Sequence, residues 1–308
     1  MPRMILLALF ALGAFLLAAI AWAWTPDRPR AALEARYLAA PSDMIDVAGT
    51  RLHVRQSGPV DAPAVILLHG FGASLHTWEP WAEVLAATHR VIRYDIPGFG
   101  LSPPDPGNDY SLARDIAILD GLMDRLGLAH AALVGHSMGG KIAWHFAAKR
   151  PDRVSRLVLV APDGFATPGK GYGEAPTVGR SLALMTVFLP RPVLRMTIAP
   201  AYANPVRLDD AMLTRYHDMM LAPGARRAML ARLSQAVLEY PADLLPRITA
   251  PVLLLWGEDD RMIPASHAAD YVRLLPGAEV VRLPNLGHVP HEEDPARSLP
   301  PIAAFLAR

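Results

Sequence analysis

A serine between two glycines is the residue of this sequence best suited to chemistry. An apolar run, Ala131 to Val134, leads into Gly135-His136-Ser137-Met138-Gly139, and a helix pattern continues to Lys149. A serine on a sharp turn from strand to helix needs small residues two positions before and after it, because a Cβ there would obstruct the backbone. The pattern predicts Ser137 as a nucleophile. The backbone N–H of Met138, at the start of the helix, would face an oxyanion formed beside it.

A glycine-rich turn earlier in the chain can supply a second oxyanion donor. The apolar run Val65 to Leu68 has a strand pattern and is followed by His69-Gly70-Phe71-Gly72. A loop in this position commonly provides the second N–H of an oxyanion hole. We expect the donor to be the N–H of Phe71.

A serine hydroxyl also needs a general base, and that base needs a group to orient it. His288 lies in the loop after a strand pattern, Ala278 to Leu283, and is predicted to be the base. His291 is the alternative, although it begins a stretch, His291 to Pro295, that we expect to be a solvated helix start. Ser137 and His288 therefore require a carboxylate from elsewhere in the chain.

An acidic loop follows another strand pattern and offers three such carboxylates. The run Val252 to Leu255 leads into Glu258, Asp259 and Asp260. All three could be ordinary solvated loop residues, and at least two of them must be. We predict that Asp260 is the carboxylate that orients His288.

Five motifs follow one another along the chain: His69 to Gly72, Asp95 to Ser102, Gly135 to Gly140, Trp256 to Asp260, and Gly287-His288. Together they resemble the esterase- and lipase-like serine hydrolases of the α/β-hydrolase superfamily, from about Ile45 to the C-terminus. The resemblance implies that Asp260, which ends a Gly-x-x-Asp loop, is the triad acid, with Asp163 as the alternative. It implies a structural turn at Asp95. Dehalogenases and epoxide hydrolases of this fold carry aspartate where this chain has Ser137, so an acyl-enzyme is expected.

Strand and helix patterns alternate along most of the chain. Further apolar runs lie at Val91 to Tyr94, Leu157 to Val160 and Val280 to Leu283, and helix patterns separate several of the runs. This alternation favours an α/β fold with a mostly parallel sheet. The resemblance implies the α/β-hydrolase fold, with an eight-stranded type of sheet and helices on both faces. We expect its core to comprise residues 43–164 and 247–308.

Residues 165–246 interrupt that alternation. They contain no convincing strand and show helix-like patches broken by prolines. We expect a helical cap, inserted before the strand that carries the triad acid. Half of the chain's methionines fall here, and methionine fills irregular apolar space, which would suit a pocket for acyl or alkyl chains. The alternative is that these side chains only pack the cap on the sheet.

The N-terminus holds a membrane segment. Met4 to Trp24 contains no charged residue, and a helix of that length matches a bilayer core of about 30 Å. We favour a single-pass transmembrane anchor over residues 1–24, followed by a linker at 25–42, because signal peptides have shorter apolar regions. The alternative is a signal segment cleaved near Ala21-Trp22-Ala23, which would export the protein. Arginines on both sides leave the orientation open.

Composition excludes several other classes of protein. The net charge is +1 and no block of like charges occurs, so we expect no nucleic-acid partner. The absence of cysteine excludes disulfides and a thiolate nucleophile. No histidine or carboxylate group has metal-ligand spacing, so we expect no cofactor and no metal.

These features predict a hydrolase that cleaves carboxylic esters through an acyl-enzyme with a Ser137–His288–Asp260 triad. We expect its substrate to be an apolar small-molecule ester or acyl compound, and we expect the membrane to be its other partner. The alternatives keep the triad and change the reaction: cleavage of a C–C bond in a diketone, of an amide or of a lactone, or acyl transfer. A non-catalytic binding protein on the same scaffold is a more remote alternative, because fold does not determine function.

Overall fold

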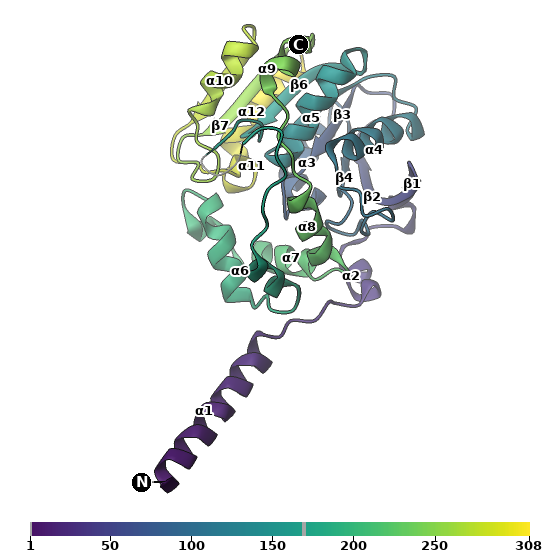
Figure 1. The fold of residues 1–308 in the computed structure, drawn as a ribbon. Helices are drawn as coiled ribbons and strands as arrows, with labels where there is room; N and C mark the ends of the chain where they lie inside the picture. The colour runs from purple at the N-terminus through teal and green to yellow at the C-terminus, as the bar shows by residue number, and fades with distance from the viewer. Residues whose placement is uncertain (1, 168–170) are drawn as a thin grey trace.

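A computed structural model describes residues 2–167 and 171–308 of the chain. Its centre is one eight-stranded sheet in the order β1-β2-β4-β3-β5-β6-β7-β8 (Figure 1). Strands β1 and β2 form an antiparallel hairpin, β2 pairs antiparallel with β4, and the remaining neighbours are parallel. The strand bounds are β1 Met44–Val47, β2 Thr50–Ser57, β3 Ala64–Leu68, β4 Arg90–Tyr94, β5 Ala131–His136, β6 Val154–Val160, β7 Val252–Gly257 and β8 Glu279–Leu283.

The central strands are buried on both faces, as their continuous apolar sequences predict. Every residue of β5 and of β7 is buried, whereas β8 is half-exposed because it lies at the edge of the sheet. Apolar side chains that alternate along each strand pack into two separate cores, one on each face. The sheet therefore needs a helical layer on either side.

Five helices form these two layers. Residues of α4 (Leu112–Arg125), α5 (Met138–Lys149) and α10 (His267–Leu274) belong to one core. Residues of α3 (Glu79–Leu85) and α12 (Pro295–Leu306) belong to the other. Ser111 caps α4 by accepting a hydrogen bond from the N–H of Arg114. The predicted α/β architecture with helices on both faces is confirmed.

The helical cap lies between β6 and β7. Its helices are α6 Arg191–Ile198, α7 Asp210–Met220, α8 Ala225–Ser234 and α9 Pro241–Leu244. Three residues of the predicted cap, 168–170, lie outside the described residues, as does residue 1 of the N-terminal segment. Proline occupies one of the first two positions of α6 and of α9, which explains why proline-rich sequence still forms helices here. The cap covers the edge of the sheet at which the parallel strands end (Figure 1).

The N-terminal helix α1 (Pro2–Ala23) projects away from the rest of the molecule on the cap side (Figure 1). Its residues Arg3–Ala23 are long and apolar enough to cross a membrane, with a mean hydropathy of 2.8 and none of the span buried. The following helix, α2 (Arg30–Tyr37), packs on the domain through Leu33, which contacts Leu101 and the α7–α8 region of the cap. The segment after α1 is thus attached to the globular domain.

Candidate active site

Ser137 occupies a strained turn between β5 and α5. Its backbone has φ 51° and ψ −116°, a conformation that a non-glycine residue adopts at a cost on the order of 1–3 kcal/mol. A Cβ on Gly135 would lie 2.4 Å from the carbonyl oxygen of Gly139, and a Cβ on Gly139 would lie 2.4 Å from that of Leu68. The two glycines flanking the serine therefore let its side chain project from the end of the strand.

The two predicted partners of that serine are hydrogen-bonded to each other. Asp260, in the loop after β7, places its Oδ2 atom 2.7 Å from Nδ1 of His288, in the loop after β8. The other carboxylate oxygen accepts the N–H groups of Met262 and Ile263 at 2.8 and 2.9 Å. A carboxylate only accepts hydrogen bonds, so Nδ1 of the buried His288 carries the hydrogen of this bond. Ser137 and His288 line the same two cavities.

The other carboxylates considered for the role of triad acid, Glu258, Asp259 and Asp163, lie in different surroundings. Glu258 and Asp259 are exposed to solvent, as expected for two of the three acidic loop residues. Asp163 lines one cavity beside Ser137, and its backbone N–H donates to the carbonyl of Ser137 at 3.1 Å. The hydrogen bond to His288 described above is made by Asp260.

His291 is buried, and the expectation of a solvated helix start there was wrong. Its Nε2 atom is 2.9 Å from the hydroxyl of Thr77, and its ring stacks on Trp78 with centroids 4.3 Å apart. Burial lowers the pKa of His291 to about 3, so the ring is neutral. The short helix α11 (Pro290–Glu293) packs against α12, and Glu293 binds backbone N–H groups of the cap. These contacts account for the burial of this segment.

The peptide between Gly70 and Phe71 is held in place by the buried side chain of His69. Nδ1 of His69 donates to the carbonyl of Gly70 at 2.8 Å, and Nε2 accepts the N–H of Ile96 at 3.0 Å. Burial lowers the pKa of His69, which keeps this arrangement neutral. In a trans peptide the carbonyl of Gly70 and the N–H of Phe71 point in opposite directions. A Cβ on Gly70 would lie 3.3 Å from that of Ser137, so this peptide passes close to the serine.

Met138 contributes the first N–H group of α5. The first N–H groups of an α-helix have no acceptor within the helix, and the helix dipole places positive charge at that end. Met138 and Phe71, the two residues predicted to supply oxyanion donors, both line one of the two cavities that Ser137 lines.

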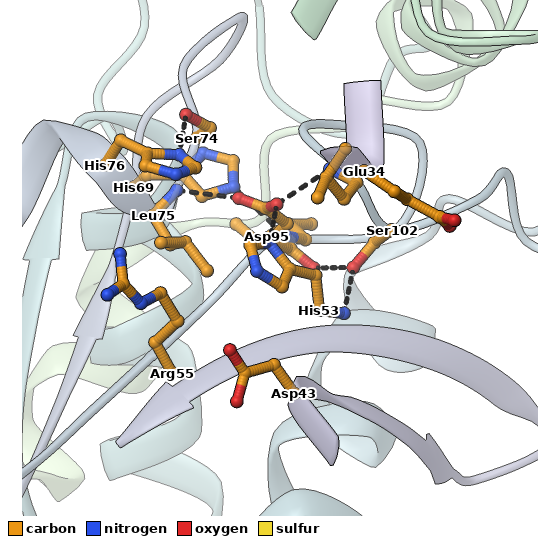
Figure 2. Close-up of polar contacts among 12 residues, drawn as sticks. Glu34, Asp43, His53, Arg55, His69, Ser74, Leu75, His76, Asp95 and Ser102 are labelled. Carbon is orange, nitrogen blue, oxygen red and sulfur yellow. Dashed lines mark hydrogen bonds and ion pairs between the residues drawn. The ribbon is translucent and has the colours of Figure 1, made fainter. Parts of the chain in front are cut away.

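Asp95 is the centre of a buried network that shapes the loops around this site (Figure 2). Its carboxylate contacts Nδ1 of His53 at 2.7 Å and accepts the N–H groups of Leu75 and Leu101 at 2.7 and 2.8 Å. The hydroxyl of Ser102 donates to its backbone carbonyl. Burial opposes ionisation, but His53 outweighs it and the pKa of Asp95 falls to about 2. Asp95 is not among the residues that line the two cavities, as expected for a structural turn.

Two cavities of different character meet at Ser137. One has a volume of about 330 Å³ and carries polar and charged side chains, including Lys141 and a buried pair in which Arg232 binds Asp115. The other has a volume of about 390 Å³ and is lined mainly by apolar side chains, most of which come from the cap. They share Phe71, Ser137, Leu233, Met262 and His288.

Sequence patterns did not reveal how the loop of His288 is held. The buried carboxylate of Glu293 accepts the N–H of Gly287 at 2.7 Å, together with those of Ala203 and Asn204 in the cap. The N–H of His288 itself donates to the cap carbonyl of Ala201 at 2.7 Å. No local motif identifies such a residue, because its two partners in the cap are about 90 positions away in the chain.

Comparisons with known proteins identify the family of this fold. The family model described as alpha/beta hydrolase fold matches residues 63–295. The chain is 33% identical to the dihydrolipoyllysine-residue acetyltransferase component of the acetoin cleaving system of Cupriavidus necator, over 83% of this chain but only 66% of that protein. It thus spans just under two thirds of that relative's length.

Two further proteins are similar over most of their length. The 2-hydroxy-6-oxononadienedioate/2-hydroxy-6-oxononatrienedioate hydrolase of Cupriavidus pinatubonensis is 30% identical, over 77% of this chain and 84% of that one. The solved structure of a membrane phospholipase A, described as a bacterial virulence factor, is 25% identical with a TM-score of 0.72, over 100% of this chain and 98% of that one. The match of the family model over residues 63–295 shows that the chain belongs to the α/β-hydrolase fold family, which supports a hydrolase.

Proposed function

We propose that this protein is a membrane-anchored serine hydrolase that cleaves carboxylic esters with an apolar acyl chain. The proposal depends above all on one observation: the strained Ser137 and the hydrogen-bonded His288–Asp260 pair open onto the same two cavities. A nucleophile, an oriented base and room for a substrate are the three requirements for acyl transfer to serine.

In the proposed reaction, the Oγ atom of Ser137 attacks the ester carbonyl while Nε2 of His288 accepts the hydroxyl proton. The N–H groups of Phe71 and Met138 stabilise the oxyanion, and Asp260 stabilises the imidazolium. The alcohol then leaves with the proton from His288, and an acyl-enzyme on Ser137 remains. Water attacks this ester, gives a proton to His288, and releases the acid as the serine is regenerated.

The contrast between the two cavities supports an ester with one apolar and one more polar side. The apolar cavity, with Met185, Leu194 and Met220 in its walls, suits an acyl chain. The polar cavity suits the alcohol. The likeness to a membrane phospholipase A favours the same class of substrate.

Cleavage of a C–C bond in a diketone is the second candidate. Two cationic side chains, Lys141 and Arg232, line the polar cavity and would suit a substrate that carries a carboxylate. The buried Asp115 already binds Arg232 through both nitrogens at 2.6 and 3.1 Å, which weakens this alternative. The similarity to the 2-hydroxy-6-oxononadienedioate/2-hydroxy-6-oxononatrienedioate hydrolase of Cupriavidus pinatubonensis supports this second candidate.

The anchor part of the proposal depends on α1, in which no residue from Arg3 to Ala23 is buried. Trp22 and Trp24 lie at its C-terminal end, where aromatic side chains favour the membrane interface. An anchor retained in the mature protein predicts that N-terminal sequencing of membrane-extracted protein finds α1 intact. Cleavage after Ala23 would support the signal segment instead.

Labelling with a fluorophosphonate probe tests the nucleophile. The wild-type protein should be labelled, whereas Ser137→Ala should not, and Ser102→Ala, which alters a buried serine of the Asp95 network, should keep the label if it folds. Failure of the wild-type protein to react would refute the proposed mechanism. Rates of hydrolysis of esters with short and long acyl chains, compared with the rate of C–C cleavage of a diketone that carries a carboxylate, then distinguish the two candidate reactions.

A further inference from the structure

The chain leaves α1 and binds to the cap at once. Trp24, the residue after α1, forms a β-bridge with Phe188, and the N–H of Thr25 donates to the carbonyl of Val187 at 2.8 Å. The hydroxyl of Thr25 accepts the N–H of Leu189 at 3.1 Å. Because no free segment separates the end of the apolar helix from the cap, a bilayer that holds α1 must lie against residues 187–189.

Ion pairs then fix the orientation of the domain relative to α1. Asp27 binds the buried Arg226 of α8 at 2.6 Å. Arg28 and Arg36 bind the fully buried Asp218 of α7, both at 3.1 Å, and the hydroxyl of Tyr37 donates to the same carboxylate. These contacts hold the cap, rather than the sheet, toward the end of α1, as seen in Figure 1.

The part of the cap nearest this attachment exposes large apolar side chains, which we name the apolar cap face. Each is between 41% and 75% exposed, although large apolar side chains are usually buried in a soluble protein. They come from the turn before α6 and from α6 itself: Leu182, Leu184, Val187, Val193 and Met196.

The charge of the same segment suits anionic lipid headgroups. Residues 175–208 contain four arginines and neither aspartate nor glutamate. Arg180 and Arg207 are exposed, and Arg191 and Arg195 pair with Asp210 from α7. Apolar side chains combined with arginine are typical of segments that lie in the membrane interface.

The apolar cavity also opens at this face. Leu182, Val193 and Thr197 line the cavity and are exposed to solvent, so they form its rim. One opening of the cavity therefore lies among the residues that would contact the bilayer, and the same cavity reaches Ser137 and His288.

We propose that the apolar cap face rests in the headgroup region of the bilayer, and that a substrate's acyl chain enters the apolar cavity directly from the membrane. This inference rests on the membrane anchor and on the ester hydrolysis proposed above. It adds the route by which a water-insoluble substrate reaches Ser137.

Site-directed fluorescence tests the contact independently of activity. The chain has no cysteine, so single cysteines can be introduced at Leu184 and Met196 on the cap face, at Leu12 within α1, and at Val60. Val60 is exposed and lies before β3, at the opposite end of the parallel strands from the cap. Each variant is labelled with an environment-sensitive fluorophore and placed in phosphatidylcholine–phosphatidylglycerol vesicles that contain brominated lipid.

We expect brominated lipid to quench the label at positions 184, 196 and 12 and to leave position 60 unchanged. Quenching at position 12 but not at 184 or 196 would overturn the contact and leave the anchor intact. No quenching at position 12 would refute the anchor, and the inference with it.

A kinetic experiment tests the entry route. The double variant Leu184→Glu/Met196→Glu adds charge to the cap face at two positions that do not line the cavity. Hydrolysis of a long-chain ester embedded in vesicles should fall at least tenfold, whereas hydrolysis of a soluble short-chain ester should change less than twofold. Val60→Glu should change neither rate. An equal loss on both esters would overturn direct entry, and a wild-type protein inactive on both would refute ester hydrolysis instead.

Discussion

The substitution Glu293→Gln tests whether the cap positions the candidate base. The carboxylate of Glu293 accepts three backbone N–H groups, from Gly287, Ala203 and Asn204, at 2.7, 3.1 and 2.8 Å. Gly287 directly precedes His288, so this carboxylate connects the loop of the base to the cap. Glutamine has nearly the same shape but retains only one acceptor oxygen.

The size of the effect follows from those three bonds. Glutamine loses at least one hydrogen bond to a charged acceptor, each worth about 1.5–3 kcal/mol, and makes the remaining ones neutral. Because Glu293 is buried, water cannot replace the lost partner. We expect the free energy of unfolding to fall by about 2–3 kcal/mol, which lowers the melting temperature by ~4–8 °C in a domain of this size. A shift of His288 should lower kcat at least tenfold, because small misplacements of a catalytic group are costly.

Thermal melting and steady-state kinetics on a soluble ester measure both effects in the full-length protein. Glu258→Gln is the matched control, because this glutamate is exposed in the loop that carries Asp260, and we expect wild-type behaviour from it. KM should stay within twofold in both variants, since Glu293 does not line either cavity. A Glu293→Gln protein with wild-type melting temperature and kcat would refute the reasoning.

Two further predictions concern the elbow and a buried histidine. Gly139→Ala should prevent stable folding or abolish labelling of Ser137, because its Cβ would lie 2.4 Å from the carbonyl oxygen of Leu68. Soluble expression and probe labelling measure these effects. The control Gly277→Ala should have little effect, because the space around its Cβ is open. Burial lowers the pKa of His145 from 6.5 to about 3, so His145 contributes stability above pH 6.5 that is lost as the pH falls toward 3. His145→Gln should therefore reduce the drop in melting temperature between pH 7 and pH 5. The control His130→Gln, at an exposed histidine, should leave that drop unchanged. An undiminished drop in His145→Gln would contradict the conclusion that burial of neutral His145 makes stability depend on pH.

Local sequence determined the elements on which the candidate site is built. Gly135, Ser137 and Gly139 form a motif whose meaning depends only on the strand before it and the helix after it, and both can be recognised from apolar periodicity. Buried strands such as β5 and β7 are visible in the same way, because burial on both faces requires a continuous apolar run. The fold class could therefore be predicted from the sequence.

Contacts between distant segments decided the rest. His291 and Glu293 have polar neighbours in sequence and were expected in solvent, yet the cap and Trp78 bury them. The pairing of Asp260 with His288 was predicted through resemblance, since Glu258 and Asp259 have the same chemistry and differ only in where the folded loop directs them. Likewise, the apolar side chains of the cap gave no sign of which would line a cavity and which would stay exposed. Periodicity reports the faces of single elements, whereas burial, cavities and the attachment of α1 to the cap arise only when elements far apart in the chain pack together.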